Sequence, residues 1–229
     1  MESTKIKKGD FIELDYTGKI KDGAVVFDTT IEKIAKDNNL DQKNAVYKPI
    51  TVCIGEGHLI KGLDEGLVGK SVGKHEFDVE PDNGFGRKKA ELLKLVPMKI
   101  FRQQNITPFS GLEVNVDGMF GIIRTASGGR VIVDFNHPLS SRDLVYDVDV
   151  KKIIIDLKEQ VEVVLELGGI AFELVSVTGT KAVIKTKQDL SAEIKNNIQK
   201  EVIRLTKVKD LVVEKKTVEK KVSSPEEKS

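Results

Sequence analysis

The stretch TVCIGEGHLIKGLDEGLVGKSVG, residues 51–73, decides how the first part of this chain folds. Because glycine adopts positive φ and lets other segments approach closely, residues 51–57 are predicted to be a strand that ends in a tight turn. The apolar residues that follow recur at near-helical spacing, which predicts a short helix with one apolar face. Its apolar positions are Leu59, Ile60, Leu63 and Leu67, and Gly66 and Gly69 are predicted to end it.

Two nucleotide-binding motifs are excluded in this stretch by their spacing. A Walker loop that ends at Gly69-Lys70-Ser71 needs a glycine where Asp64 stands. A dinucleotide fingerprint that begins at Gly55 needs a glycine where Ile60 stands. The glycines are therefore interpreted as structural.

Length and composition indicate a soluble protein of more than one domain. The chain has 229 residues, a net charge of +1, 32% charged residues and 5% aromatic residues. Such a balanced charge gives no argument for nucleic-acid binding, which depends on clustered Lys and Arg. The N-terminus lacks the apolar run of a signal peptide, and no segment is apolar enough to span a bilayer. A cytoplasmic location is expected.

The cysteine and histidines give no sign of a reactive or metal site. Cys53 is the single cysteine, so no intramolecular disulfide can form, and its apolar neighbours predict a buried strand residue. His58, His75 and His137 are scattered along the chain without the spacing of zinc ligands. We expect no metal and no cofactor.

Alternating apolar residues predict an antiparallel sheet in the first part of the chain. Residues 6–28 have the pattern of a hairpin, with Ile12, Leu14 and Tyr16 on one face and a turn at residues 21–23. Residues 29–48 are interpreted as a long surface connection with one helical turn. Further strands are predicted at residues 75–81 and 144–150.

The region from 87 to 137 interrupts this pattern and is predicted to be a small inserted domain. It has its own expected helix at residues 90–104, strands around residues 114–116 and 130–133, and a hairpin turn at residues 127–129. Insertions of this kind are tolerated where the host chain enters and leaves at nearby points.

The last part of the chain is predicted to be a separate α+β module. Strands are expected at residues 171–177, 181–186 and 211–215, with a helix over residues 190–205. Apolar residues recur on this helix at every fourth position, from Leu190 to Val202. A sheet of about three strands has two edges, so we expect the module to form a homodimer. The charge-rich tail over residues 213–229 is expected to be disordered.

Five separated motifs, in this order, resemble those of the FKBP-type peptidyl-prolyl isomerases. The motifs are Tyr16, Phe27-Asp28, the glycine-rich stretch, Gly84-Phe85-Gly86 and the strand over residues 144–148. The interruption between Gly86 and His137 resembles that of SlyD-like and long archaeal FKBPs, whose extra domain sits in the flap. The last module is similar to the extra domain of the longer archaeal members.

The resemblance implies an α+β fold made of three parts. These are an FKBP antiparallel sheet wrapped on a short helix (residues 1–86 and 138–153), a β-rich insert-in-flap domain (87–137) and a C-terminal α+β domain with a charged tail (154–229). It implies that the protein isomerises X-Pro bonds and acts as a folding chaperone, with unfolded or proline-containing polypeptides as partners. No membrane and no nucleic-acid partner is expected.

Carried over position by position, the resemblance places nine residues around a proline-binding cavity. Those expected to be catalytic are Tyr16, Phe27, Asp28, Ile60 (through its backbone N–H), Phe85 and Tyr146. Those expected to bind substrate are Ile50, Leu59 and Leu63. Many family members have an aromatic residue at the Ile50 position, Trp at the Leu63 position and Tyr at the Phe85 position, so this pocket is expected to be less aromatic. The alternative that several of these residues are ordinary core stays open.

The inserted domain is expected, from the same resemblance, to bind unfolded chains. Its apolar candidates for that surface are Met98, Ile100, Phe101, Phe109, Met119 and Phe120, and a role in the core of the small domain is the alternative. Two other functions stay open. The protein could be a holdase with little isomerase activity, or its last module could associate with nucleic acid or the ribosome. The basic residues for that association are Lys181, Lys185, Lys187, Lys195, Lys200, Arg204, Lys207 and Lys209.

Overall fold

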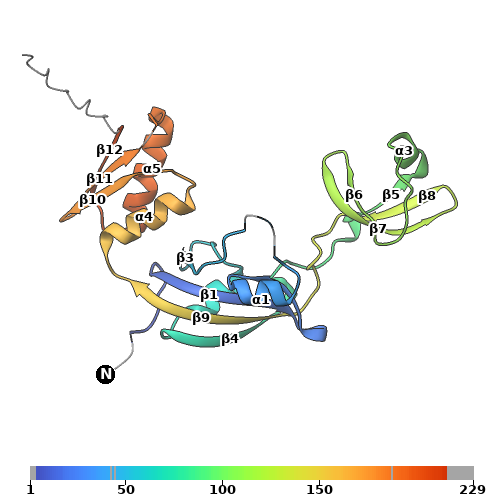
Figure 1. Ribbon diagram of the computed structural model, residues 1–229, viewed down its shortest axis with the longest axis horizontal. Helices are drawn as coiled ribbons and strands as arrows, with labels where there is room; N and C mark the ends of the chain where they lie inside the picture. The colour runs from blue at the N-terminus through green and yellow to red at the C-terminus, as the bar shows by residue number, and fades with distance from the viewer. Residues whose placement is uncertain (1–3, 42, 44, 187, 216–229) are drawn as a thin grey trace, which may run out of the picture.

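The computed structural model describes residues 4–41, 43, 45–186 and 188–215, and these form three lobes, each with its own sheet. The central lobe comprises residues 4–86 and 138–154, the insert lobe residues 87–137, and the C-terminal lobe residues 155–215. The insert and C-terminal lobes lie at opposite ends of the central lobe (Figure 1). Most of the charged tail predicted for residues 213–229 lies outside the described residues.

Five antiparallel strands form the central sheet in the order β2-β1-β9-β4, with β3 paired to the first half of β1. Alternation of polar and apolar residues sends every second side chain of β1 and β9 to one face, where Leu14 and Val148 are buried. The predicted strands and hairpin are therefore confirmed. The strands are β1 Phe11–Ile20, β2 Val25–Thr29, β3 Ile50–Cys53, β4 Gly73–Val79 and β9 Leu144–Ile154, with 3-10 turns at Asp22–Ala24 and Pro81–Asn83.

Two short helices complete the central lobe: α1 Glu32–Asp37 and α2 Lys61–Leu67. The apolar face predicted for α2 is confirmed at Leu63 and Leu67, which are buried against the sheet. Leu59 and Ile60 were predicted on the same helix but precede it, because α2 begins at Lys61. Gly66 lies inside α2, which corrects the prediction that it ends the helix. A Cβ atom at Gly66 would stand 2.9 Å from the Phe77 ring, so glycine is needed there for close packing of α2 on β4.

The insert lobe is a four-stranded antiparallel sheet in the order β5-β8-β7-β6. The helix predicted over residues 90–104 is wrong in its first part, which is the 3-10 turn Ala90–Leu92 and then β5. A residue that precedes proline is pushed from helical to extended conformation, so Pro97 favours the strand before it. The elements are β5 Leu93–Pro97, α3 Met98–Gln103, β6 Glu113–Val116, β7 Met119–Ser127 and β8 Arg130–Asp134. The predicted turn at Gly128 and Gly129 is confirmed.

The C-terminal lobe has three strands in the order β10-β11-β12 and two helices. The first helix, α4, was not expected from the sequence. Its β-branched residues, such as Val161 and Val164, disfavour helix locally, but they are buried in the core of the lobe and Asp156 caps the helix by accepting from the N–H of Glu159. The elements are α4 Leu157–Leu167, β10 Leu174–Thr178, β11 Lys181–Thr186, α5 Ala192–Leu205 and β12 Asp210–Lys215.

A buried carboxylate joins the insert lobe to the two linkers that connect it to the central lobe. Asp134, at the end of β8, is 2% exposed, and its Oδ2 accepts from Lys88 Nζ (2.9 Å) and Arg124 Nη2 (2.7 Å). Its Oδ1 accepts from the backbone N–H (3.0 Å) and the side-chain amide (2.8 Å) of Asn136. Asn136 in turn pairs with the N–H and C=O of Lys89. Asp134 thus holds the outgoing and returning linkers side by side.

The surroundings of Asp134 also control its ionisation. Burial alone would raise the pKa of Asp134, but the hydrogen bonds from Lys88, Asn136 and Arg124 outweigh burial and hold its pKa well below the usual range. A lowered pKa in the folded state means that the ionised carboxylate stabilises the fold above the unfolded pKa of about 3.9. This stabilisation is lost as the pH falls through the folded pKa.

We predict that Asp134→Asn destabilises the insert lobe by about 2–3 kcal/mol at neutral pH, because it leaves the charged donors without a carboxylate partner. The difference from wild type should shrink only below about pH 4. Urea unfolding followed by NMR signals of β7 and β8 at several pH values measures it. Asp82→Asn is the matched control, since it removes an exposed pair with Arg87 and should leave the insert unchanged. A pH-independent difference would contradict the role given to the Asp134 charge.

Candidate functional site

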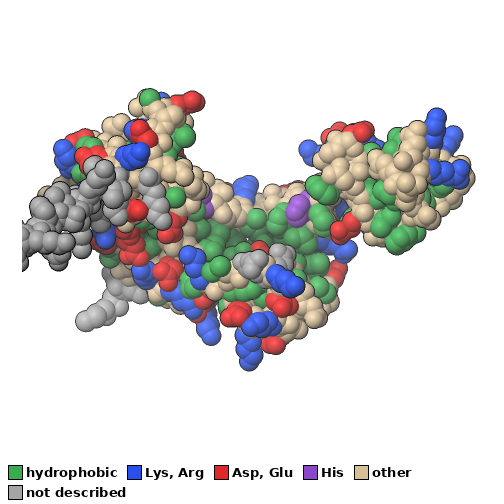
Figure 2. All heavy atoms as spheres, turned by 45° about the horizontal axis from the view of Figure 1, so that its top comes forward, with side chains coloured by type: hydrophobic (Ala, Val, Ile, Leu, Met, Phe, Trp, Pro, Cys, Tyr) green, Lys and Arg blue, Asp and Glu red, His purple; other side chains and the backbone are tan. Residues whose placement is uncertain are grey.

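The structure brings the residues of the predicted cavity together on one face of the central sheet. Leu63 and Tyr146 belong to the buried core of the central lobe, and the other apolar members pack against it while remaining partly exposed. The partly exposed members are Tyr16, Phe27, Ile50, Leu59, Ile60 and Phe85. Figure 2 shows apolar side chains gathered on the central lobe between the two outer lobes. The set therefore has a buried floor and an accessible rim, and its role in binding stays a prediction.

Three partly exposed aromatic rings of the rim and the buried Tyr146 ring form a chain of contacts. The Phe27 ring lies edge-on to Tyr146 and to Phe85, with centroid distances of 5.7 Å and 6.3 Å. Tyr16 and Tyr146 are tilted against each other at 6.0 Å. Edge-to-face pairs of this kind are favoured by the ring quadrupoles, so the rings hold one another in place.

Tyr16 and Asp28 make the polar contact of this rim. The Tyr16 hydroxyl donates to Asp28 Oδ2 at 2.6 Å. The pKa of Tyr16 is raised mainly by burial and further by the Asp28 carboxylate. The pKa of Tyr146 is raised by the same two causes in the same order. Both phenols are therefore protonated donors throughout the neutral range. Within the described residues the Tyr146 hydroxyl has no hydrogen-bond partner, so it is available to an acceptor from outside.

The segment that leads into α2 carries a backbone donor next to side chains of the same cluster. Ile60 caps the helix in extended conformation, and its carbonyl accepts from the N–H groups of Leu63 and Asp64. No acceptor for the N–H of Ile60 is found among the described residues. This free donor, next to the Leu59 and Ile60 side chains, can bind a carbonyl oxygen.

Gly18 allows the aromatic rings to approach the sheet. A Cβ atom at this position would lie 2.6 Å from Cζ of Phe27 and 2.9 Å from Cε1 of Tyr146. The rings can occupy their places only because β1 has no side chain there. Sequence analysis missed this residue, although a glycine in an otherwise alternating strand is a signal of close approach.

Two residues of the returning linker also join the rim and were missed. The imidazole of His137 stacks on the Phe85 ring, with a centroid distance of 4.4 Å and an interplanar angle of 1°. Leu139 packs against the same cluster, and Ser140 Oγ donates to the carbonyl of Phe85 at 3.1 Å. Sequence analysis placed His137 at the boundary of the insert, and its neighbour Phe85 is 52 positions away, so no local pattern connects them.

The apolar residues predicted for the insert lobe fall into two groups. Phe101 is 1% exposed and belongs to the core, which corrects its assignment to a binding surface, and Met98 and Ile100 are partly buried against that core. Phe120 (79% exposed) and Met119 (40%) face solvent. Other exposed apolar residues of the lobe are Phe109, which was predicted, and Leu93, Leu95 and Ile132, which were not.

Comparison with known protein families matches two parts of the chain. Residues 2–116 match the family model described as FKBP-type peptidyl-prolyl cis-trans isomerase. The chain belongs to this family. Residues 94–139 match the model described as the IF domain of FKBP26, which covers the insert lobe from β5 onward. The chain is accordingly an enzyme of the peptidyl-prolyl cis-trans isomerase class.

Three relatives illustrate the similarity. A short-type peptidyl-prolyl cis-trans isomerase of Methanocaldococcus jannaschii is 32% identical over 149 residues, which are 65% of this chain and 94% of the relative. An FKBP-type 16 kDa isomerase of Escherichia coli is 28% identical over 156 residues, or 66% of this chain and 95% of the relative. SlyD of Haemophilus influenzae is 28% identical over 152 residues, 64% of this chain and 71% of the relative.

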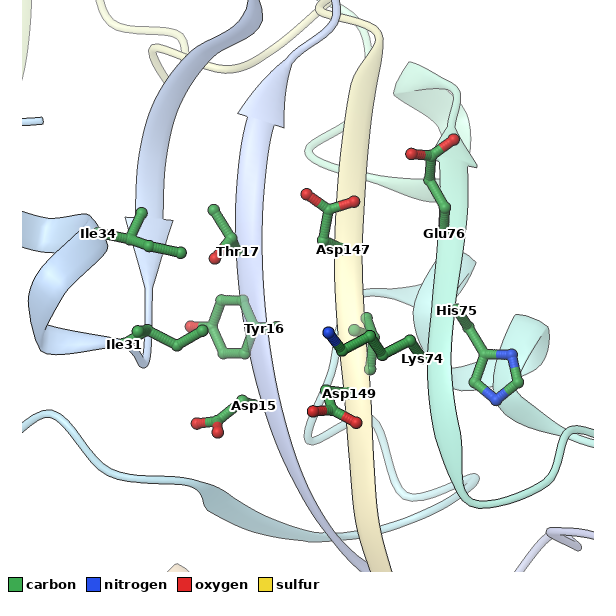
Figure 3. Close-up of a pocket in the computed structure, with 11 residues that line it drawn as sticks. Asp15, Tyr16, Thr17, Ile31, Ile34, Lys74, His75, Glu76, Asp147 and Asp149 are labelled. Carbon is green, nitrogen blue, oxygen red and sulfur yellow. The ribbon is translucent and has the colours of Figure 1, made fainter. Parts of the chain in front are cut away.

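A pocket of about 540 Å³ lies on the opposite, outer face of the FKBP sheet, and its chemistry is different. Figure 3 shows that Asp15, Asp147 and Asp149 point into it from β1 and β9, with Lys74 extending across β9. The aspartates are paired with lysines: Lys19 with Asp147 (2.6 Å), and Lys151 with Asp149 (2.7 Å) and Asp15 (3.2 Å). Ile31 and Ile34 give this pocket an apolar side, but its floor is ion-paired, unlike the aromatic cluster on the other face. No helix of the described residues is long and apolar enough to span a membrane.

We predict that Gly18→Ala lowers kcat/KM of this FKBP-type isomerase by about tenfold, because the new methyl group displaces the Phe27 and Tyr146 rings. A prolyl tetrapeptide assay measures the effect, and thermal unfolding reports the accompanying loss of stability. Gly168→Ala in the C-terminal lobe is the matched control, since its nearest neighbours stand at 3.4 Å or more. Wild-type activity of Gly18→Ala would contradict the assignment of the two rings to the site.

Proposed function

We propose that the protein accelerates X-Pro isomerisation by binding the twisted amide non-covalently in the cavity between β1, β2, α2 and the Phe85 segment. The barrier of about 20 kcal/mol arises because amide resonance is lost at the twisted transition state. Twisting also reduces charge separation across the amide. An apolar environment therefore favours the twisted amide over the planar one, which is the differential binding that catalysis needs.

The observation that carries this proposal is the convergence of Tyr16, Phe27, Phe85 and Tyr146 around a partly exposed apolar surface. In the proposed mechanism, Phe27 and Phe85 hold the proline ring and Leu63 closes the floor. The Ile60 N–H binds a substrate carbonyl. The hydroxyl of Tyr146 is a second donor near the amide, and Asp28 orients Tyr16 through their 2.6 Å hydrogen bond.

We further propose that the insert lobe captures unfolded chains and delivers them to this cavity. Leu95 on β5 lies opposite Ile132 on β8 in the sheet register, and both are exposed. Phe120 projects from β7 with 79% of its surface accessible. These exposed apolar residues suit apolar segments of a client chain.

The second candidate function is a holdase with little isomerase activity. The observation that favours it is Leu63, which is aliphatic and 2% exposed at the floor where many family members have Trp. A smaller floor side chain contacts the proline ring over less area, so transition-state binding is weaker. Tetrapeptide kinetics of the full chain separates the two candidates, because a holdase leaves the tetrapeptide rate near that of the uncatalysed reaction.

We also propose that the C-terminal lobe forms a homodimer. Of the described strands, β10 and β12 each have a neighbour on one side only, and α5 exposes Ile194 (40%) and Ile203 (38%). We predict a dimer at tens of micromolar by sedimentation equilibrium, converted to monomer by the pair of substitutions Ile194→Asp and Ile203→Asp. A wild-type monomer at that concentration would overturn this proposal without affecting the others.

We predict that variants of the cavity and of the insert lobe separate the two activities. Asp28→Ala and Tyr146→Phe should lower tetrapeptide kcat/KM by about tenfold or more, and they should slow proline-limited protein refolding as well. Phe120→Ser with Leu95→Ser should slow protein refolding severalfold and leave the tetrapeptide rate unchanged, because a tetrapeptide is too short to need capture.

Asn115→Ser is the control for the insert variants. It changes an exposed residue directly opposite Phe120 in the register without removing apolar surface. Equal losses in both assays for the insert variants would contradict the division of labour. Unchanged tetrapeptide rates in both cavity variants would remove the cavity assignment.

A further inference from the structure

The turn between β3 and α2 lies between the candidate substrate site and the C-terminal lobe. Glu56 is flanked by Gly55 (φ +88°) and Gly57 (φ +70°), and the chain continues directly into Leu59 and Ile60. Glycines in left-handed conformation form this turn readily, but they also give it many alternative conformations. The position of the Ile60 N–H therefore depends on what anchors the turn.

Two side chains from outside the turn anchor it. The Gly55 N–H donates to Asp64 Oδ1 at 2.8 Å, which ties the first half to α2. The second half is tied to the C-terminal lobe, because Arg204 Nη1 on α5 donates to Glu56 Oε2 at 2.6 Å. Residues 56 and 204 are 148 positions apart, and theirs is an ion pair between two lobes.

The C-terminal lobe is a firm support for this contact. Phe11, Cys53 and Ile154 of the central lobe belong to the same buried cluster as Val161 and Val208 of the C-terminal lobe, so the two lobes share an apolar interface. Cys53 stands three residues before Glu56 and is fully buried there. Arg204 is itself held by Glu201, to which its Nη2 donates at 2.7 Å. The guanidinium thus reaches Glu56 from a fixed position.

We propose that Arg204 is a positioning residue for the isomerase: through Glu56 it fixes the turn that presents Leu59 and the Ile60 N–H to the substrate. The C-terminal lobe thereby supports substrate binding in a site to which it contributes no residue. This inference rests on the proposed function of Leu59 and Ile60. The C-terminal lobe, which resembles the extra domain of the longer archaeal FKBPs, thus acquires a role in substrate binding.

The contact should affect substrate binding more than the chemical step. A carbonyl bound by the Ile60 N–H is held in both the planar and the twisted state of the substrate, so weakening this contact raises KM and changes kcat little. The effect should be modest, because Arg204 is half-exposed and an ion pair of this kind is screened by salt.

The test measures kcat and KM for a prolyl tetrapeptide by NMR exchange spectroscopy on the full chain. Arg204→Met and Glu56→Gln should each raise KM by about twofold to fivefold with kcat unchanged. The double variant should be no worse than either single variant, because both remove the same contact. Arg204→Lys should restore part of the wild-type KM. High salt should raise KM of the wild type but not of Arg204→Met.

Lys195→Met is the matched control on the same helix. It removes the pair of Lys195 with Asp189, which lies within the C-terminal lobe at 2.7 Å, and should leave KM at the wild-type value. Wild-type KM for both Arg204→Met and Glu56→Gln would overturn the proposal. Additive effects in the double variant, or an equal rise of KM in Lys195→Met, would do the same.

Amide hydrogen exchange distinguishes failure of this inference from failure of the proposed site. Arg204→Met should speed exchange at residues 55–60 and leave the strands of the central sheet unchanged; unchanged exchange in the turn overturns the inference. Leu59→Ala tests the site itself. If Leu59→Ala leaves KM unchanged while Arg204→Met still speeds exchange, the anchor holds the turn but the turn does not bind substrate, and the positioning role is overturned together with the site.

Discussion

The packing of α2 against the central sheet is the interaction on which the rest of the structure depends. Leu63 and Leu67 of α2 are 2% and 0% exposed, and they share one core with Tyr146 and Val148 of β9. The candidate site is the open end of this same core. Substitutions at its floor must therefore change stability and activity together, whereas those at the rim can change activity alone.

The insertion of a whole lobe is compatible with this site because its two linkers leave and return together. The N–H of Ser141 donates to the carbonyl of Gly86 at 2.8 Å, so the two ends of the insertion are adjacent in the central lobe. Closing the central lobe around the insertion therefore costs little additional chain entropy on folding. The same linkers carry Phe85 and the imidazole that stacks on it. The orientation of the insert lobe and the shape of the cavity rim are therefore set by one short double segment, and Asp134 is the group that fixes it.

Much of the central lobe could be predicted from the sequence, because strands with one buried face have a period of two and turns need glycine. The cavity residues could be named by family resemblance, and the structure brings them together. The strand β5 and the helix α4 could not be predicted correctly. For β5, the apolar run before Pro97 is compatible with either a helix or a strand. For α4, burial of Val161 and Val164 in the core outweighs the low helix propensity of valine. Contacts such as Glu56 with Arg204 have no local signal at all.

The two segments that border the candidate site, the β3–α2 turn and the Phe85 segment, lie outside the sheet of the central lobe. Segments of this kind open at low free-energy cost unless other contacts hold them. Each has a contact from a different lobe: the turn is tied to Asp64 of α2 and also to Arg204 of the C-terminal lobe, and the Phe85 segment continues into linkers that Asp134 of the insert lobe clamps. An apolar cavity can discriminate between planar and twisted amides only while its walls stay in place. The outer lobes thus supply rigidity at the two positions where the FKBP sheet itself cannot.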